Sequence, residues 1–375
     1  MSKRKICIFC ETWESGGIES FLTNVLLRLD MQFFSVDVVA AVLKTSVFTS
    51  RLEKCGVQFW ELSGNTRNVS RNIKLFHRLM EQQKYDVMHL NIYQALSMCY
   101  AAEAKKAGIP VRIIHSHNTA LRKSAGRSLK LMIHIMAKQC MVENGTRFLA
   151  CSSDAAQFMF PQKITDNGAF FVVPNGIETE RFRFDWQKRE RFREQWGLQG
   201  KLVVGNIGRL CCQKNQNFLL DVFRELCSFR PESKLLLVGS GDDEQMLRNK
   251  AAQLGIEENV LFYGTTASPE EALWAMDAFA FPSLFEGLGI VAIEAQAAGL
   301  PVFCSEAIPK EAYVTEQIHQ VSLGKGAEVW AKQISTCKPM QDRAEAVLKV
   351  RQAGFDIEDV VRQIVGYYLE GKNSV

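Results

Sequence analysis

Two carboxylates mark the segment of this sequence that is best equipped for chemistry. Glu286 follows the apolar run AFAFPS in a glycine-containing loop, and Glu294 lies eight residues later in the apolar stretch IVAIEAQAA. A carboxylate in so apolar a helix is costly to bury unless it is hydrogen-bonded or paired. A ribose diol would satisfy Glu294, and Glu286 would meet a sugar hydroxyl or a developing positive charge. The structural alternative for Glu294 is a pairing with a buried lysine or a backbone cap.

Two cations follow the apolar run VVGNI. Arg209 and Lys214 lie five residues apart in GRLCCQKN, directly after Gly208. At a strand end, the arginine fork and the lysine point charge can both reach one diphosphate. The alternative is a solvent-facing loop whose charges have no role in binding.

A glycine pair follows the first apolar run, KICIFC. Gly16 and Gly17 stand at the predicted start of a helix, where main-chain N–H groups can face an anion without a side chain in the way. The full dinucleotide pattern GxGxxG is absent, and a tight turn without a ligand would need the same glycines.

Three of the six histidines lie at predicted strand ends, His89 in DVMHLN and both His115 and His117 in VRIIHSHN. Strand alternation places His115 and His117 on one face. A metal site would still lack a further ligand at suitable spacing, and the eleven cysteines show no zinc-like spacing, so no metal is expected. Hydrogen bonding to a polar substrate is the prediction, with a satisfied core histidine as the alternative for His89.

The elements that must position these residues repeat one pattern, a short β-branched run, a polar or glycine-rich loop, and a helical period. This pattern is typical of parallel βα units, and it predicts an α/β protein with two doubly wound sheets. A ligand would bind at the carboxyl ends of the strands, in a cleft between the sheets. The predicted strands are KICIFC, VDVVAAV, VQFWEL, DVMHLN, VRIIHSHN, FLACS and FFVVP in the first half, and KLVVGNIG, KLLLVGSG, VLFYG, AFAFPS and LPVFCS in the second. Between PNGIE (174–178) and the strand at Lys201, residues 179–198 are interpreted as a charged linker and a lead-in helix.

The length and composition fit a two-domain globular enzyme. The chain has 375 residues, of which 47% are hydrophobic and 23% charged, and this composition excludes a disordered or low-complexity protein. No apolar run approaches the roughly 18 residues of a spanning helix, and the first apolar run is too short for a signal peptide, so a cytoplasmic location is expected. Residues 1–180 carry a net charge of +7 and residues 181–375 a net charge of −3, without the basic stripe of a nucleic-acid-binding protein.

Together these motifs resemble the retaining GT-B glycosyltransferases of family four, also called glycosyltransferase group one. The resemblance covers nearly the whole chain, and its most specific part is FEGLGIVAIEA, which holds Glu286 and Glu294. It implies two Rossmann-like domains facing across a cleft, an acceptor-side domain at 1–178 and a nucleotide-sugar-binding domain at 179–355. The remaining residues, 356–375, resemble the final helix of the family, which crosses back to the first domain. The other matching motifs are Gly16-Gly17, HSHN at 115–118, PNGIE at 174–178, GRL with Lys214-Asn215, and GSGDDE at 239–244.

The resemblance also implies a role for each candidate residue. Arg209 and Lys214 would clamp the donor diphosphate, which faces the backbone at Gly17. Glu286 would contact the transferred sugar, and Glu294 would bind the ribose.

Further positions complete this implied nucleotide-sugar site. His117 would hydrogen-bond the donor sugar and help to position the acceptor. The remaining binding positions are backbone or loop residues, namely Gly16, Gly208, Gly239, Ser240 and Gly241. No metal cofactor is implied, because helix amino termini and fixed cations would stabilise the leaving diphosphate.

The expected activity is therefore a retaining, metal-independent hexosyl transfer from a nucleotide-sugar, with UDP as the expected nucleotide. The expected acceptor is a glycan or lipid-linked glycan in the biosynthesis of cell-surface polysaccharide, either exopolysaccharide or capsule. A nucleotide-sugar 2-epimerase of the same architecture and a non-catalytic nucleotide-sugar-binding module are the alternatives.

Residues 121–142 combine basic and apolar side chains at helical spacing. Arg122, Lys123, Arg127, Lys130 and Lys138 alternate with leucine, methionine and isoleucine. Such a helix can lie on an anionic membrane surface, or it can simply pack on the first sheet. Peripheral membrane association is thus one of two expectations for this segment.

Overall fold

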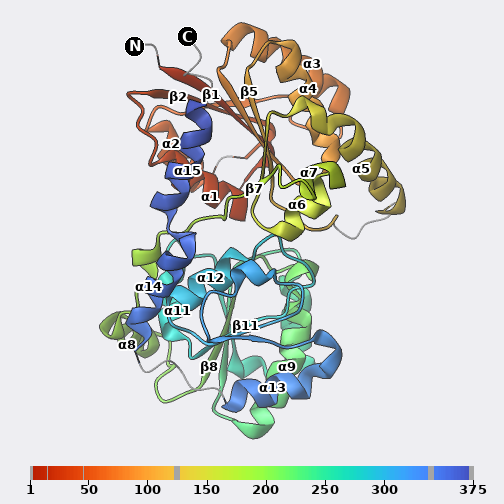
Figure 1. The fold of residues 1–375 in the computed structure, drawn as a ribbon. Coiled ribbons are helices and arrows are strands. Elements are labelled where there is room, and N and C mark those ends of the chain that lie inside the picture. The colour runs from red at the N-terminus through yellow and green to blue at the C-terminus, as the bar shows by residue number, and fades with distance from the viewer. Residues whose placement is uncertain (1–2, 15, 45, 122–126, 337–341, 371–375) are drawn as a thin grey trace. The chain divides into compact units, whose positions relative to one another are not determined.

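The computed structural model describes residues 3–14, 16–44, 46–121, 127–336 and 342–370. Their contacts divide the chain into two compact units (Figure 1). Unit 1 is Met1–Ile177 with Ile357–Val375, and unit 2 is Glu178–Asp356. The boundaries expected from the sequence, 178/179 and 355/356, lie one residue away from these.

Unit 1 is built on a seven-stranded parallel sheet with strand order β3-β2-β1-β4-β5-β6-β7. All six residues of β4 are buried, as expected of a strand covered by helices on both faces. The strands are β1 (Arg4–Trp13), β2 (Phe34–Leu43), β3 (Gln58–Glu61), β4 (Val87–Ile92), β5 (Val111–Ser116), β6 (Arg147–Ala150) and β7 (Phe171–Val172). The helices are α1 (Gly17–Leu26), α2 (Val47–Glu53), α3 (Val69–Gln83), α4 (Cys99–Lys106), α5 (Arg127–Met141), α6 (Ser153–Met159), α7 (Gln162–Thr165) and α15 (Ile357–Leu369).

Unit 2 is built on a six-stranded parallel sheet with strand order β10-β9-β8-β11-β12-β13. The prediction of two doubly wound α/β sheets is confirmed, and one strand, β13, was not predicted because its sequence IHQ has no apolar run. The strands are β8 (Val203–Ile207), β9 (Lys234–Val238), β10 (Val260–Gly264), β11 (Ala278–Phe281), β12 (Val302–Cys304) and β13 (Ile318–Gln320). The helices are α8 (Trp186–Gln195), α9 (Gln216–Phe229), α10 (Glu244–Gln253), α11 (Pro269–Ala275), α12 (Ile290–Ala297), α13 (Gly326–Thr336) and α14 (Ala346–Val350).

Helix α15 packs in unit 1 although all of unit 2 precedes it in the sequence. Its residues Val360, Ile364 and Tyr368 are fully buried in the core that also contains β1 and α1. The Tyr368 hydroxyl lies 2.7 Å from Nδ1 of the buried His89 on β4. The last helix thus supplies both apolar area and a hydrogen bond to the centre of the first sheet.

The PNGIE segment provides the surface on which α15 lies. A Cβ atom at Gly176 would stand 2.9 Å from Cγ2 of Val360 and 3.0 Å from the Cα atom of Ile357. The Ile357 N–H also donates to the Ile177 carbonyl, at 2.9 Å. Glycine at position 176 is therefore explained by the close approach of the helix.

We expect Gly176→Ala to lower the free energy of unfolding of unit 1 by about 1–3 kcal/mol, because the added methyl group meets helix backbone that cannot move freely. Gly366→Ala in the same helix is the control. A Cβ atom there meets nothing within 4 Å, so a gain of up to about 1 kcal/mol from helix propensity is expected. Chemical denaturation of both variants measures the difference, and equal stabilities would contradict the packing argument.

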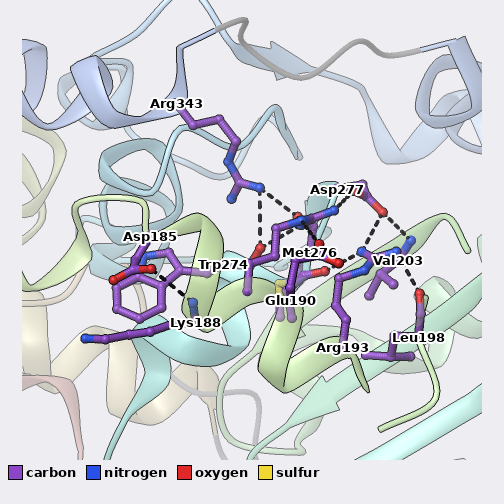
Figure 2. Close-up of polar contacts among 12 residues, drawn as sticks. Asp185, Lys188, Glu190, Arg193, Leu198, Val203, Trp274, Met276, Asp277 and Arg343 are labelled. Carbon is purple, nitrogen blue, oxygen red and sulfur yellow. Dashed lines mark hydrogen bonds and ion pairs between the residues drawn. The ribbon is translucent and has the colours of Figure 1, made fainter. Parts of the chain in front are cut away.

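Three arginines converge on the carboxyl end of α11 in unit 2, and Figure 2 labels two of them, Arg193 and Arg343. Arg189 of α8 donates to the carbonyls of Trp274 and Met276, at 2.6 and 2.8 Å. Arg193, one turn further along α8, donates to the carbonyl of Ala275 at 2.7 Å. Arg343 donates to the carbonyl of Met276 at 3.1 Å and to that of Leu273 at 3.2 Å. The last carbonyls of a helix lack partners within it and carry its negative dipole end, so they attract these cations.

Asp277, the second residue after α11, holds two of these arginines and the first strand of the unit. Its carboxylate contacts Arg189 at 2.6 Å and Arg193 at 3.2 Å, and it accepts the Val203 N–H of β8 at 2.8 Å. Burial, together with the charge of Arg189, lowers the pKa of Arg343 to about 9. The charged lead-in helix predicted for 179–198 is present as α8, but two of its three arginines, Arg189 and Arg193, are buried.

Candidate active site

The candidate residues fall into two groups, one in each unit. In unit 1, Gly16 is the residue before α1 and Gly17 is its first residue. A Cβ atom at Gly16 would lie 2.5 Å from Oε2 of Glu19, a buried residue in the first turn of the helix. The Glu19 carboxylate thus folds back over the helix start, close to where a diphosphate was predicted. The contact between Gly17 and a diphosphate stays a prediction.

The three strand-end histidines form a continuous buried row. His89 Nε2 lies 3.1 Å from His115 Nδ1, and the rings of His115 and His117 are 4.0 Å apart at their centroids. Burial lowers the pKa of His89 and of His117 to about 3, so both are neutral at physiological pH. His89 is bonded within the core on both ring nitrogens, as the alternative for this residue had it.

His117, like His115, has one buried ring nitrogen without a hydrogen bond of standard geometry to a described residue. Its Nε2 lies 2.9 Å from Oδ1 of Asn91, an arrangement in which Nε2 carries the proton and donates it. Its Nδ1 and Oδ1 of Asn175 are both buried without a hydrogen bond of standard geometry to a described residue, although the Asn175 amide is close enough to oppose the shift in the pKa of His117. A neutral histidine can exchange a hydrogen bond with a sugar hydroxyl, and it carries no charge that would attract an anion.

The described residues contain no group of three His, Cys, Asp or Glu side chains placed to hold a metal ion. The expected absence of a metal stays a prediction.

In unit 2, two glycine loops leave the neighbouring strands β8 and β9 in direct backbone contact. The N–H of Gly208 donates to Val238 at 2.9 Å, and that of Leu210 donates to Ser240 at 3.0 Å. A Cβ atom at Gly239 would lie only 2.1 Å from the Gly208 carbonyl oxygen, and one at Gly241 only 2.2 Å from that of Leu210. These glycines are therefore required for loop packing, which brings the exposed Ser240 next to the loop that contains Arg209.

Lys214 and Glu286 form a largely buried ion pair at the carboxyl end of the second sheet. Lys214 Nζ lies 2.7 Å from Glu286 Oε1 and 4.9 Å from the centroid of the Phe281 ring. Glu286 is 6% exposed. The cation predicted for the diphosphate and the carboxylate predicted for the sugar are thus in contact, and their assignment to these two groups stays a prediction.

Backbone and amide hydrogen bonds fix the two loops that contribute this pair. The N–H of Leu284 donates to the Gln213 carbonyl at 2.8 Å, and the Gln213 side-chain amide donates to Phe285 at 3.0 Å. Asn215, which has a left-handed φ of 55° just before α9, donates its amide to the Pro282 carbonyl at 3.0 Å. The pair is therefore held by bonds that do not involve its own charges.

Arg209 lies in the same loop but is exposed. Its guanidinium forms no hydrogen bond or ion pair with any residue that the structure describes. The charge is therefore available to an anionic ligand, and its assignment to the diphosphate stays a prediction.

Glu294 on α12 is a partly buried carboxylate that has no hydrogen bond or ion pair with a described side chain. Burial, helped by the charge of Glu270, raises its pKa to about 7 against the opposing charges of Arg181 and Lys214. The alternative in which Glu294 pairs with a lysine or caps backbone does not agree with this environment. Its oxygens remain available to hydroxyl groups.

Two family models match this chain. The model described as glycosyl transferases group 1 matches residues 188–345, and the model described as glycosyltransferase family 4 matches residues 15–181. The chain belongs to the family 4, group 1 glycosyltransferases. The group 1 match contains β8–β13 together with the Glu286 and Glu294 segment of the glycosyltransferase, and the family 4 match contains β2–β7.

Relatives and solved structures agree with this assignment. The glycosyltransferase is 25% identical over 378 residues to EpsF of Bacillus subtilis (strain 168), a protein assigned as a glycosyltransferase, with 98% of this chain and 97% of EpsF covered. It is 26% identical over 251 residues, 64% of each chain, to the UDP-Gal:alpha-D-GlcNAc-diphosphoundecaprenol alpha-1,3-galactosyltransferase of Escherichia coli. The crystal structure of Anabaena HepE with UDP and glucose superposes with a TM-score of 0.78 at 20% identity, covering 97% of this chain and 98% of HepE. The fold of the glycosyltransferase is GT-B.

Four residues that surround His117 in unit 1 or Glu294 in unit 2 were not predicted as site residues from the sequence. Asn91 and Asn175 accompany His117, and Arg181 and Glu270 set the charge around Glu294, with Arg181 Nη2 2.9 Å from Glu270 Oε2. Only Asn175 carried a signal, because it belongs to the PNGIE motif. The others depend on side chains brought together by the fold.

The raised pKa of Glu294 predicts how the stability of unit 2 depends on pH. Between about pH 4.5 and 7 the folded state holds a proton that the unfolded state has lost, so the stabilising contribution of this group falls as the pH rises through that window. We expect Glu294→Gln to remove this decline and to raise the free energy of unfolding at pH 8 by about 1–3 kcal/mol. Denaturation curves between pH 5 and 8 measure it.

Glu316→Gln serves as the control, because the Glu316 side chain is 88% exposed and its loss should change stability by less than about 0.5 kcal/mol. An unchanged pH slope in the Glu294 variant would show that the carboxylate is not held in a desolvated state.

Proposed function

We propose that this glycosyltransferase moves a sugar, with retention of anomeric configuration and without a metal ion, from a UDP-sugar to a glycan or lipid-linked glycan. The observation that carries the proposal is the contact between Lys214 and Glu286, at 2.7 Å, at the carboxyl end of β11. UDP is favoured because it occurs in the names of two similar proteins or structures. One is the galactosyltransferase named for UDP-Gal, and the other is the crystal structure of HepE with UDP and glucose. The same galactosyltransferase acts on a diphosphoundecaprenol-linked sugar, which supports a lipid-linked acceptor and a place in polysaccharide biosynthesis.

In the proposed reaction, the bond between the anomeric carbon and the diphosphate oxygen breaks, and the nucleoside diphosphate leaves with the electron pair. Lys214 and the exposed Arg209 stabilise the growing negative charge on the diphosphate. Glu286, the carboxylate partner of Lys214, stabilises the positive charge that develops on the oxocarbenium-like sugar. The acceptor hydroxyl attacks from the face that the diphosphate leaves, and its proton passes to the departing phosphate oxygen.

The remaining candidate residues bind rather than react. Glu294 accepts hydrogen bonds from the ribose hydroxyls. These bonds take the place of those that water would make to an exposed carboxylate. The loops at Gly208 and at Gly239, Ser240 and Gly241 present backbone to the nucleotide. His117 hydrogen-bonds the donor sugar as a neutral imidazole, and the start of α1 at Gly16 and Gly17 faces the diphosphate.

We expect Lys214→Ala and Glu286→Ala each to lower turnover roughly 100- to 1,000-fold while the chain stays folded. Release of UDP from UDP-sugars in the presence of extracted lipid acceptor measures the activity, and GDP- and ADP-sugars in the same assay test the choice of nucleotide. Activity within twofold of wild type in either variant would contradict the assignment. No release by the wild-type chain from any donor would instead favour a non-catalytic binding module.

Lys250→Ala is the matched control for these variants. Lys250 forms an ion pair of the same length, 2.7 Å, with Asp221 in the same unit, and the two side chains lie on α10 and α9. Its loss should leave turnover unchanged.

We also propose that α5 attaches the enzyme to an anionic membrane surface. Six large apolar side chains of this 15-residue helix are between 38% and 61% exposed, namely Leu129, Leu131, Met132, Ile133, Ile135 and Met136. The opposite side is fixed to unit 1 by His134, which accepts from the Ala95 N–H at 3.1 Å and donates to the Phe158 carbonyl at 3.0 Å. So much exposed apolar surface on one element is typical of a protein or membrane contact.

Charge favours the membrane among these partners. Lys130 lies on the same helix, whereas the ammonium of Lys138 donates to the Gln157 and Phe158 carbonyls of unit 1, at 3.1 and 3.4 Å. A lipid-linked acceptor would be met at such a surface. Arg122 and Lys123 of the predicted segment lie outside the described residues. None of the described helices is long and apolar enough to cross a membrane.

We expect the wild-type chain to float with vesicles that contain phosphatidylglycerol, and the double variant Met132→Glu with Met136→Glu to lose most of this binding. Met246→Glu on α10 is the control, because Met246 is also exposed, at 44%, but lies in unit 2. Flotation of wild type and double variant to the same extent would exclude α5 as the attachment site.

A further inference from the structure

Arg181 lies where two parts of the predicted nucleotide site meet. It belongs to the short 3₁₀ helix Thr179–Phe182 at the start of unit 2, and this helix packs against α12, which carries Glu294. The Arg181 side chain is 34% exposed, so its charge is partly withdrawn from water. A cation in this position acts on its neighbours more strongly than a solvated one.

The guanidinium of Arg181 fixes the loop that follows β10. Its Nη2 donates to the Ala267 carbonyl, and its Nε and Nη2 both lie 2.9 Å from Oε2 of Glu270 at the start of α11. The other end of this loop is Gly264, whose carbonyl accepts the Gly239 N–H at 2.7 Å. Ligands of open parallel sheets bind beyond the carboxyl ends of the strands, where both loops lie. Arg181 therefore holds a loop that contacts the predicted nucleotide loop at Gly239.

The same cation acts on the charge state of Glu294. Burial raises the pKa of Glu294 to about 7, and the charge of Arg181 opposes this rise more strongly than that of Lys214 does. The carboxylate of Glu270 acts in the other direction, but its charge is compensated by the ion pair with Arg181. A second carboxylate, that of Glu178, lies 3.6 Å from Nη1 of Arg181. Without Arg181, Glu294 would lose an attractive charge and meet the uncompensated charge of Glu270, so its pKa would rise further.

The charge state of Glu294 matters for a ribose diol. An ionised carboxylate can accept a hydrogen bond from each of two neighbouring hydroxyls, whereas protonation converts one of its oxygens into a donor. Hydrogen bonds to a charged group are also stronger than those to a neutral one. A residue that favours the ionised form therefore strengthens the binding of the nucleotide without contacting it.

We propose that Arg181 is a positioning residue of the nucleotide site, which fixes the loop after β10 through Ala267 and Glu270 and provides the positive charge that lets Glu294 meet the ribose as a carboxylate. The inference rests on the proposed function, because it takes the ribose contact of Glu294 from it. It adds a residue that acts through others and reacts with neither substrate.

Calorimetric titration of UDP into the full chain, at several pH values between about 6.5 and 8.5, tests the inference. We expect Arg181→Ala to weaken UDP binding roughly 10-fold near neutral pH and by a smaller factor at the highest pH, where Glu294 ionises again. Arg181→Lys keeps the charge but not the forked contact, so it should keep the pH dependence of the wild type with a smaller loss of affinity. Circular dichroism checks that each variant is folded, and Arg181→Lys carries the test if Arg181→Ala is not.

Arg183→Ala is the matched control. Arg183 follows the same 3₁₀ helix and forms an exposed ion pair with Glu180, at 2.7 Å, so its loss should leave UDP binding unchanged. The double variant Arg181→Ala with Glu270→Gln separates the two roles, because it removes the uncompensated carboxylate while the loop still lacks its arginine. We expect this double variant to bind UDP more weakly than the wild type, with a pH dependence closer to that of the wild type than Arg181→Ala shows.

The outcomes distinguish this inference from the proposed function. Equal binding of UDP by the wild type and Arg181→Ala at every pH would overturn the inference and leave the proposed function standing. A loss by the same factor at every pH would also overturn it, because Arg181 would then be a structural contact alone. If the wild-type chain binds none of UDP, GDP and ADP, there is no nucleotide site for Arg181 to position, and the inference fails together with the proposed function.

Discussion

Buried arginines at the carboxyl end of α11 tie this helix to α8, and Asp277 ties them to β8. Arg189, Arg193 and Arg343 bind the last carbonyls of the helix, and Asp277 balances part of their charge. Removing one member of a buried charged group typically costs about 3–5 kcal/mol, because the remaining charges stay buried without a partner. Since Asp277 leads directly into β11, and β11 into the loop of Glu286, the position of the site depends on a cluster to which no site residue belongs.

The same cluster shows where sequence reasoning reaches its limit. The strands could be predicted because a parallel sheet covered on both faces needs continuous apolar runs. KLLLV and VMHLN are such runs, and they form the buried strands β9 and β4. The sequence of α8, WQKRERFREQ, has the composition of a solvated helix. Its burial follows from helix carbonyls about 85 residues further along the chain, and no local pattern encodes that partner.

The candidate site was predictable to different degrees for comparable reasons. Glu286 and Glu294 stand out because a carboxylate is conspicuous among apolar residues, and the structure explains both environments. The role predicted for the glycines at 208, 239 and 241 in binding stays a prediction, because Gly239 and Gly241 are already needed where the two loops meet backbone to backbone. Arg181 gave no signal, because one arginine in a charged linker is ordinary until Ala267 and Glu270 are brought against it.

The place of α15 has a consequence for the order in which the protein is made. As the ribosome extends the chain, residues 1–177 emerge long before Tyr368. During this interval His89 lacks one of its two hydrogen-bond partners, and the apolar side chains that α15 later covers are exposed to water. Unit 2, whose residues are continuous, meets no such delay. The domain synthesised first is therefore the one completed last, and during that interval it is the part of the nascent chain that most needs protection from aggregation.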